Sequence, residues 1–320
     1  MKQASLAWVI AVTGLFAGFS TQARALTLFV ANTFDTNGIV SFTSAGVGSA
    51  FASFGDDFPG GVAFDSSGNL YVAITSESGG QDHIEKFNSA GVGTTFATGV
   101  SQPRGLAFNS TGNLFVANSN FDTIEEFTPS GVGTVFADTD MNSPGALAFN
   151  ATGTLFVANE ADIVEFNSSG VGTIFASSGL SGPTGLAFNA TGTLFVANQN
   201  GYIQEFTPAG VGTHFVRLPL GVDPVGLAFN STGTLFVTTT ANTIVEYSPS
   251  AVSTLFASSD LDVPTNLAFN PVPEPPASVL LAGTLGALLA LGRRRFIPKW
   301  WESRTRTKQS SCGTEFSRNS

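Results

Sequence analysis

The sequence predicts an all-β protein built from one repeated unit of four short strands. Each unit holds four short apolar runs separated by turn residues, and none of the runs shows helical spacing. The first runs after Ala25 belong to the second strand of a unit, whereas the last, Pro264–Phe269, is a first strand with no successor. The units are led by prolines about 40 residues apart, the length of a propeller blade: Pro59, Pro103, Pro144, Pro183, Pro224 and Pro264. A six-bladed β-propeller explains these observations, because the fragments at the two ends complete one blade and close the ring.

One unit shows each expected strand in turn. The turns Asn189–Gly192 and Thr207–Gly210 each end on a glycine, which adopts positive φ without steric cost. The proline in the second turn fixes φ near −65° at a position where a turn needs that value. The four expected strands are Gly185–Phe188, Leu194–Ala197, Ile203–Phe206 and Gly212–Val216.

The aromatic composition predicts sheet packing and gives no sign of a cofactor site. The chain holds 30 Phe against 3 Trp and 3 Tyr, with 42% apolar and 11% charged residues. Most of the phenylalanines occupy fixed positions of the repeat, such as Phe108, Phe115, Phe127 and Phe136. A residue that recurs in each unit is expected to pack between neighbouring sheets.

The charge is unevenly distributed along the chain. Residues 26–270 carry 20 acidic side chains against three basic ones, Lys86, Arg104 and Arg217. From Gly292 onward there are eight Lys and Arg. An acidic body argues against nucleic-acid binding, which depends on neutralising phosphates, and favours the attraction of cations.

Residues 1–25 have the pattern of a secretory signal peptide. Lys2 precedes an uncharged apolar stretch, and Ala23-Arg24-Ala25 has the small-x-small form of a cleavage site. The repeat starts directly after it, so residues 26–270 are expected to be an exported propeller. The one cysteine, Cys312, lies outside the repeats, so packing and strand pairing must hold the propeller without a disulfide.

Residues 271–295 predict a sorting signal with a transmembrane helix over residues 277–292. Pro273, Glu274 and Pro275 precede that uncharged stretch, and Arg293, Arg294 and Arg295 follow it on the side expected to be cytoplasmic. This arrangement resembles the PEP-CTERM sorting signal of Gram-negative bacteria. The resemblance implies processing by an exosortase, transient anchoring in the inner membrane, and delivery to the outer surface or an extracellular matrix that contains exopolysaccharide. Residues 296–320 form a basic tail, expected to be disordered, which the family pattern lacks.

The repeats also resemble those of NHL-type and lactonase-type six-bladed propellers. The likeness is carried by Gly61–Ala73, the run GVAFDSSGNLYVA, and by its counterparts in each unit. It covers residues 26–270 at the level of the fold. Propellers of these types include binding modules, lactonases and lyases, so the resemblance alone does not determine function.

The lactonase resemblance implies an axial divalent cation held by Asn and acidic side chains. Asn32, Asn118, Asn159 and Asn198 end the second strand in four units, and Glu160 breaks the repeat directly after Asn159. A metal needs a convergent, asymmetric set of oxygen ligands. The alternative is that an Asn found in most blades ends its strand by bonding its own turn. Glu160 is the best single candidate for an axial ligand.

Acidic residues also cluster in the loops that join one unit to the next. These loops share one face of a propeller with those that add Glu77, Asp82 and Asp122, and their spacing matches no EF-hand. A Ca²⁺ site, a surface for a cationic polymer and a solvated acidic rim are all compatible with this pattern. The main members are Asp56, Asp57, Asp138, Asp140 and Asp223.

No catalytic residue can be assigned from the sequence. His83 and His214 lie in different units, Cys312 is in the tail, and no Gly-x-Ser-x-Gly elbow occurs. We therefore expect an exported, non-enzymatic binding or scaffold propeller that needs no cofactor. The alternative is an exported lactonase- or lyase-type enzyme with an axial divalent cation. The two differ in asymmetry, because an enzyme should gather several polar residues that break the repeat on one face.

Overall fold

The computed structural model describes residues 27–33, 38–77 and 79–271. The chain divides into two units, Met1–Glu274 and Pro275–Ser320, and the described residues all belong to the first. The predicted signal peptide, the sorting signal from Pro273 to Arg295 and the basic tail lie outside the described residues. Within the described ranges every regular element is a strand, and no helix there has the length and apolarity to cross a membrane.

The described residues form twenty-four strands, arranged in six four-stranded antiparallel sheets. In every sheet one strand, the inner strand, lies next to the axis. The second, third and outer strands follow it in that order toward the rim. The inner strands are β4 (Phe58–Phe64), β8 (Pro103–Phe108), β12 (Leu147–Phe149), β16 (Pro183–Phe188), β20 (Pro224–Phe229) and β24 (Pro264–Phe269). The second strands are β1 (Leu28–Asn32), β5 (Leu70–Thr75), β9 (Leu114–Asn118), β13 (Leu155–Ala158), β17 (Leu194–Asn198) and β21 (Leu235–Thr239).

The remaining strands lie toward the rim. The third strands are β2 (Gly38–Phe42), β6 (His83–Phe87), β10 (Thr123–Phe127), β14 (Ile163–Phe166), β18 (Tyr202–Phe206) and β22 (Thr243–Tyr247). The outer strands are β3 (Gly48–Ser53), β7 (Gly93–Thr98), β11 (Gly133–Ala137), β15 (Gly172–Ala176), β19 (Gly212–Arg217) and β23 (Ser253–Ala257). We number the blades by their second strands, so that blade 1 contains β1 and blade 6 contains β21.

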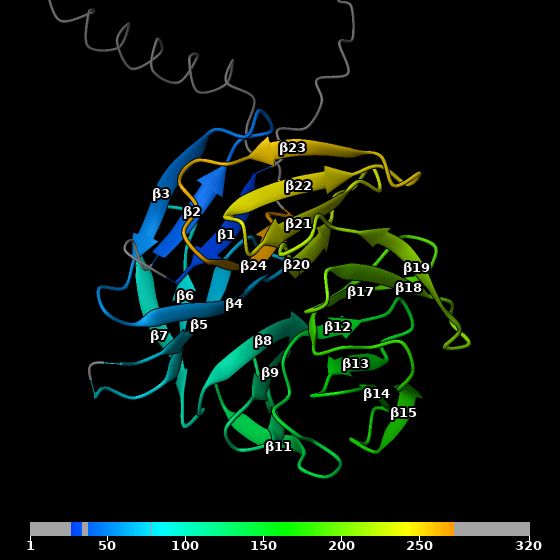
Figure 1. Ribbon diagram of the computed structural model, residues 1–320. Helices are drawn as coiled ribbons and strands as arrows, with labels where there is room; N and C mark the ends of the chain where they lie inside the picture. Colours follow the sequence, from blue (N-terminus) through cyan, green and yellow to red (C-terminus); the bar gives the residue numbers. More distant parts are fainter. Residues whose placement is uncertain (1–26, 34–37, 78, 272–320) are drawn as a thin grey trace, which may run out of the picture. The chain divides into compact units, whose positions relative to one another are not determined.

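The predicted six-bladed propeller and its closure are confirmed. Blade 1 is built from both ends of the repeat region, with the order β24-β1-β2-β3 (Figure 1). Strand β24 pairs antiparallel with β1, and Leu28 lies opposite Phe269. The inner strands contact one another in a complete ring, β4 to β8, β12, β16, β20, β24 and back to β4. Among the described residues the ring of blades is therefore continuous from its first strand to its last.

In four blades the turn between the inner and second strands forms because an asparagine side chain accepts backbone N–H groups, and in blade 2 Asp65 does the same. Asn189 Oδ1 accepts the N–H groups of Thr191 and Thr193 at 3.0 and 2.9 Å. Gly192 follows with φ of 83°, a conformation that glycine adopts without the Cβ clash of other residues. The same contacts recur at Asn109, Asn150 and Asn230. The Asn-x-Thr patterns of this chain thus form turns.

The core lies between neighbouring blades and repeats around the ring. In each blade an aromatic residue of the second strand packs edge-to-face against one ring of its own outer strand and one ring of the next inner strand. Phe115, for example, lies 5.0 Å from both Phe136 and Phe149. Such pairs add about 0.5–1.5 kcal/mol each beyond their buried area. The recurring phenylalanines are therefore what fasten one sheet to the next.

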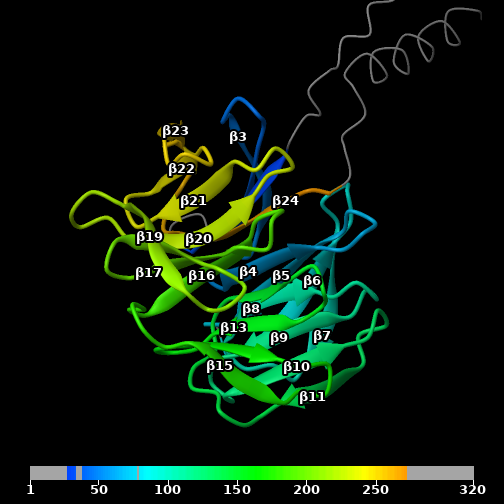
Figure 2. The same cartoon turned by 90° about the vertical axis from the view of Figure 1, so that its right-hand side faces the viewer.

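The inner strands approach one another closely around the axis (Figure 2). A Cβ atom at Gly61 would lie 2.1 Å from the carbonyl oxygen of Arg104, and one at Gly105 would lie 2.2 Å from that of Gly145. Glycine is required at these positions because any side chain would collide with the next strand. The close approach fixes the residues that precede these glycines at the centre of the ring.

Candidate axial binding site

A cavity of about 450 Å³ lies where the inner strands begin. Its walls come from the starts of the inner strands and from the loops that follow the second strands, so all six blades surround it. Pockets of a few hundred Å³ at such convergent loops are the usual size for small-molecule sites. The cavity is therefore the candidate functional site of the described chain.

The residues after the inner-strand prolines make this cavity asymmetric. All six of them line it, although the repeat does not conserve their chemistry. Arg104 supplies a guanidinium, two blades supply threonine hydroxyls, and the others supply glycine or valine. The set is Gly60, Arg104, Gly145, Thr184, Val225 and Thr265. No sequence pattern described above predicts this convergence. The pattern that could have predicted it is that the residue directly after the leading proline differs from unit to unit, whereas the proline is present in every unit.

Glu160 and Gln199 reach the cavity from the loops after β13 and β17. The side-chain amide of Asn142 donates a hydrogen bond to the Glu160 carboxylate, and the Glu160 N–H bonds the carbonyl oxygen of Asn142 at 3.1 Å. These two contacts hold the Glu160 loop against the loop that leads into blade 4. Asn266 of β24 lines the opposite wall. The cavity thus joins one guanidinium, one carboxylate, and several amides and hydroxyls.

The four strand-ending asparagines are buried, and three of them bond the neighbouring loop. Asn159 Oδ1 accepts the N–H of Asn142 at 2.7 Å, and Asn198 Oδ1 accepts the N–H of Ser181 at 3.0 Å. Asn32 donates to the carbonyl oxygen of Asp260 at 3.0 Å. Of the four, Asn159 alone lines the axial cavity. The structure therefore does not bring this set together around the axis.

Asn118 differs from the other three. It is fully buried, and its Oδ1 has no hydrogen-bond partner among the described residues. Its amide nitrogen lies 3.4 Å from Thr123 Oγ1. Counted from the equivalent alanines Ala97, Ala137 and Ala176, the segment that leads to Pro103 is one residue shorter than those that lead to Pro144 and Pro183. Asn159 and Asn198 each accept a backbone N–H from the preceding loop. No backbone N–H of the described residues bonds Asn118 Oδ1 in the same way.

Several loop carboxylates bond backbone N–H groups of the same face. Asp82 Oδ2 accepts the N–H of Gln102 at 2.6 Å, and Asp122 Oδ1 accepts the N–H of Ser143 at 2.7 Å. Asp57 Oδ1 lies 2.9 Å from the Ser76 hydroxyl. These contacts link loops of neighbouring blades. Asp56, Asp138 and Asp140 lie exposed, and Asp223 is half-buried.

The described residues do not offer a site that fits a divalent cation. They contain no cluster of three or more His, Cys, Asp or Glu side chains placed to hold one. In the axial cavity Glu160 is the one carboxylate, Asn159 Oδ1 is already bonded to a backbone N–H, and a guanidinium shares the space. A cation site needs several converging oxygen ligands and no adjacent positive charge. The axial metal implied by the lactonase resemblance is therefore not matched by these residues.

Neither histidine lies in the axial cavity. His83 begins strand β6, and its Nδ1 lies 3.0 Å from the carbonyl oxygen of Gln81. His214 lies in the outer strand β19, where its ring is 4.6 Å from that of Tyr202. The two histidines therefore lie in different blades, blade 2 and blade 5, as their positions in different units predict.

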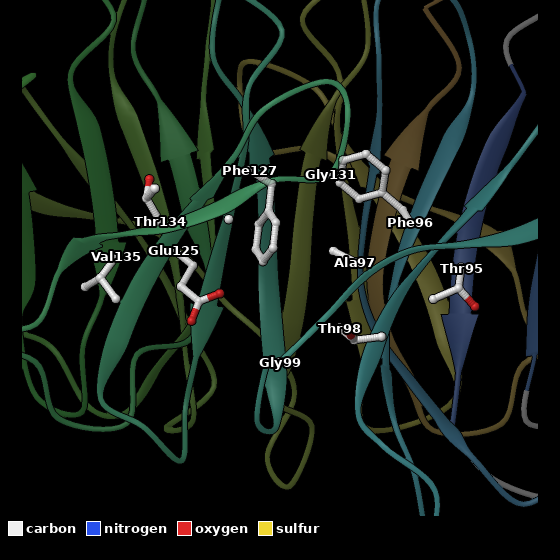
Figure 3. A pocket seen from close by; sticks show the side chains of 11 residues that line it. Thr95, Phe96, Ala97, Thr98, Gly99, Glu125, Phe127, Gly131, Thr134 and Val135 are labelled. Atoms are coloured by element: carbon white, nitrogen blue, oxygen red, sulfur yellow. The ribbon is translucent and has the colours of Figure 1, made fainter.

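A second cavity, of about 550 Å³, opens between the outer parts of blades 2 and 3 (Figure 3). Glu125 and Phe127 of β10 form its floor, between Thr95 and Thr98 of β7 and Thr134 of β11. Burial raises the pKa of the Glu125 carboxyl, and a hydrogen bond from Asn118 opposes that rise. The same position holds Gln204 in blade 5 and valine in three other blades. This groove carries a single polar group that breaks the repeat, whereas the axial cavity carries several.

Comparison with known proteins gives solved structures of the same fold. No family model and no curated protein sequence matches the chain. A virginiamycin B lyase from Staphylococcus aureus is 16% identical with a TM-score of 0.56, covering 75% of this chain and 86% of its own. A gluconolactonase from Xanthomonas campestris is 17% identical with a TM-score of 0.56, covering 65% and 78%. A protein of unknown function from Bacteroides caccae is 13% identical with a TM-score of 0.60, covering 78% and 100%.

The likeness is one of fold. At these identities it establishes a propeller with structural neighbours of the lyase and lactonase type, and it transfers no activity.

Proposed function

We propose that this chain is an exported propeller that binds a small polar ligand, or one unit of a polymer, in its axial cavity. The observation that carries the proposal is the asymmetry of that cavity, where Arg104, Glu160, Gln199 and Asn266 converge from four blades. A symmetric scaffold has no need of such a set, because repeat-conserved residues would fill the axis equally well.

The polar groups of the cavity are suited to hydrogen bonding. Thr184 Oγ1 donates to the carbonyl oxygen of Pro224 at 3.2 Å, and Thr265 Oγ1 donates to that of Gly60 at 3.3 Å. Their hydroxyl lone pairs remain available as acceptors. No aromatic side chain lines this cavity among the described residues, so it lacks a stacking surface for a planar base. A hydroxylated ligand matches this mixture of donors and acceptors.

The cellular address is proposed from the sequence alone. The signal peptide and the PEP-CTERM-like segment support export, exosortase processing after transient inner-membrane anchoring, and final placement on the outer surface or in an exopolysaccharide-containing matrix. A hydroxylated ligand would be abundant there. The acidic loop face would attract cations diffusely, with Ca²⁺ bound weakly if it binds at all.

The test is calorimetric titration of the full chain with a panel of monosaccharides and sugar acids. The variant Gln199→Ala/Asn266→Ala should weaken binding at least about tenfold, since two hydrogen-bonding side chains that line the cavity are lost. Asn200→Ala is the matched control, because Asn200 follows Gln199 but does not line the cavity. The proposal is wrong if no compound of the panel binds at millimolar concentration, or if binding is the same in both variants.

An enzyme of lyase or lactonase type is the second candidate, at the same cavity. The fold neighbours named above favour it, as does the convergence of polar residues that break the repeat. Because the residues do not fit a metal, Glu160 would act as the general base and Arg104 would stabilise developing negative charge. A lactone screen without added metal tests it: turnover lost in Glu160→Gln, with ligand binding retained, would establish catalysis over binding alone.

A further inference from the structure

Arg104 is the one basic side chain that lines the axial cavity among the described residues. The described body carries acidic side chains in large excess over three basic ones. Lys86 lies 3.8 Å from Asp65 and over the ring of Tyr71, and Arg217 lies over the ring of Tyr202. Arg104 has no carboxylate or aromatic partner among the described residues. It is the cation of this body that remains available to a ligand.

The backbone of Arg104 is held rigidly. Pro103 before it is buried, and Gly61 of blade 2 packs so closely that a Cβ there would lie 2.1 Å from the Arg104 carbonyl oxygen. On the other side Gly105 packs against Gly145 in the same way. An arginine on a fixed strand loses less entropy when it binds than one on a loose loop.

The chemistry of the guanidinium points to a planar oxyanion. Its fork of N–H groups matches a carboxylate with two parallel hydrogen bonds. Arg104 forms no salt bridge with Glu160 or any other carboxylate of the described residues, so its guanidinium can bind one ligand carboxylate directly. A phosphate dianion would need a second cation, and no other Lys or Arg lines this cavity among the described residues.

The rest of the wall suits hydroxyl groups. The Glu160 carboxylate lies in the same cavity as Arg104. It accepts one hydrogen bond from Asn142. A carboxylate can accept several, so it retains acceptor capacity for ligand hydroxyls. Asn266 Oδ1 accepts the N–H of Leu267 at 2.7 Å, which leaves its NH₂ group with no partner among the described residues. Gln199 can both donate and accept.

We infer that the axial cavity binds a hydroxylated carboxylic acid of uronic-acid type, with its carboxylate on Arg104 and its hydroxyls on Glu160, Gln199 and Asn266. This inference rests on the proposed function, since it names the ligand class of the same cavity. The cavity volume of about 450 Å³ accommodates one or two sugar units.

The experiment is calorimetric titration of the full chain with D-glucuronate, D-galacturonate, the corresponding neutral sugars and inorganic phosphate. The uronates should bind at least about tenfold more tightly than the neutral sugars, because hydrogen bonds to charged groups are the stronger kind. Arg104→Gln should remove this preference and bring uronate binding down to the level of the neutral sugars. Arg217→Gln is the matched control, because it removes the same charge outside the cavity.

Each outcome decides a different question. Equal binding of uronates and neutral sugars, or an unchanged preference in Arg104→Gln, overturns the inference and leaves the proposed function standing. Tighter binding of phosphate than of uronates also overturns it, in favour of a phosphorylated ligand. Binding of none of the probes overturns both. Melting curves of both arginine variants confirm that each is folded.

Discussion

Phe269 in the last strand packs edge-to-face against Phe236 of blade 6, with ring centroids 5.1 Å apart and planes at 82°. Phe236 also contacts Phe256 of its own blade at 5.0 Å. This is the same three-ring contact that joins every other pair of blades, although β24 is followed in its blade by β1 from the start of the repeat region. The ring is therefore closed by the same packing that builds it.

Removing the closure should destabilise the whole body. Leu267 of β24 is 3% exposed and packs with Leu28, Val30 and Phe236. Leu267→Ala should cost about 2–4 kcal/mol, because it leaves a cavity in a shared core. Deletion of residues 264–270 should lower the melting temperature further, in one cooperative transition. Leu220→Ala, at an 85% exposed position, is the control and should change stability by less than about 0.5 kcal/mol. A deletion variant that melts with the full chain would refute closure.

The repeat predicts the strands well because each one is specified locally. The second strand expected at Leu194–Ala197 is Leu194–Asn198 in the structure, and the first, expected from Gly185, begins at Pro183. Short apolar runs, Asx turns and turn glycines act over a few residues, so a single unit contains them all. The pairing of β24 with β1 also followed, because an incomplete unit at each end needs a partner.

The axial site could not be derived in the same way. Arg104 and Glu160 are 56 positions apart in the chain and line the same cavity because the start of inner strand β8 and the loop after second strand β13 both lie at the axis. Asp82 and Asp122 read as rim carboxylates in the sequence, yet each accepts a backbone N–H of the next loop. The axial cavity and the hydrogen bonds of these loop carboxylates both depend on how loops of different blades approach each other. No pattern within one repeat contains that information.

Two buried asparagines that occupy equivalent positions should differ in their contribution to stability. Asn198 Oδ1 accepts the N–H of Ser181, so Asn198→Ala leaves that donor without its partner and should cost about 1–3 kcal/mol. Asn118 Oδ1 has no partner among the described residues, so Asn118→Ala should cost less. Urea unfolding of both variants measures the difference. Equal losses would show that Asn118 is satisfied in solution, by water for example.

Glu125 should make stability depend on pH. Burial raises the pKa of its carboxyl in the folded state, so its contribution is fully present below the unfolded pKa and is lost as pH rises through the folded value. Glu125→Gln should therefore stabilise the protein at neutral pH and have little effect in acid. Glutamine already fills this position in blade 5 as Gln204. The control is Glu246→Gln, from the third strand of blade 6. Melting temperatures that change equally at pH 4 and pH 7 would contradict the assignment.

The predicted sorting signal can be tested independently of the fold. Replacing Pro273, Glu274 and Pro275 by alanine should leave the protein in the membrane fraction, whereas the unmodified chain is expected to mature to a smaller, released or matrix-bound form. The reason is that an exosortase is expected to recognise this motif before the apolar stretch. Fractionation and immunoblotting measure both size and location. Identical sizes and fractions for the two proteins would show that these residues do not direct sorting.

Divalent cations should bind weakly and without a defined stoichiometry. The axial cavity has one carboxylate beside a guanidinium, and the loop carboxylates of Asp82 and Asp122 are engaged by backbone N–H groups. Because a tight Ca²⁺ site needs six to eight converging oxygens, calorimetry with Ca²⁺ should show no micromolar site, and EDTA should leave the melting temperature unchanged. Glu160→Gln is the matched variant, since it removes the one axial carboxylate and keeps the side chain's shape. One equivalent of metal bound at micromolar affinity, lost in Glu160→Gln and accompanied by lactone turnover, would replace the binding function with that of a metal-dependent enzyme.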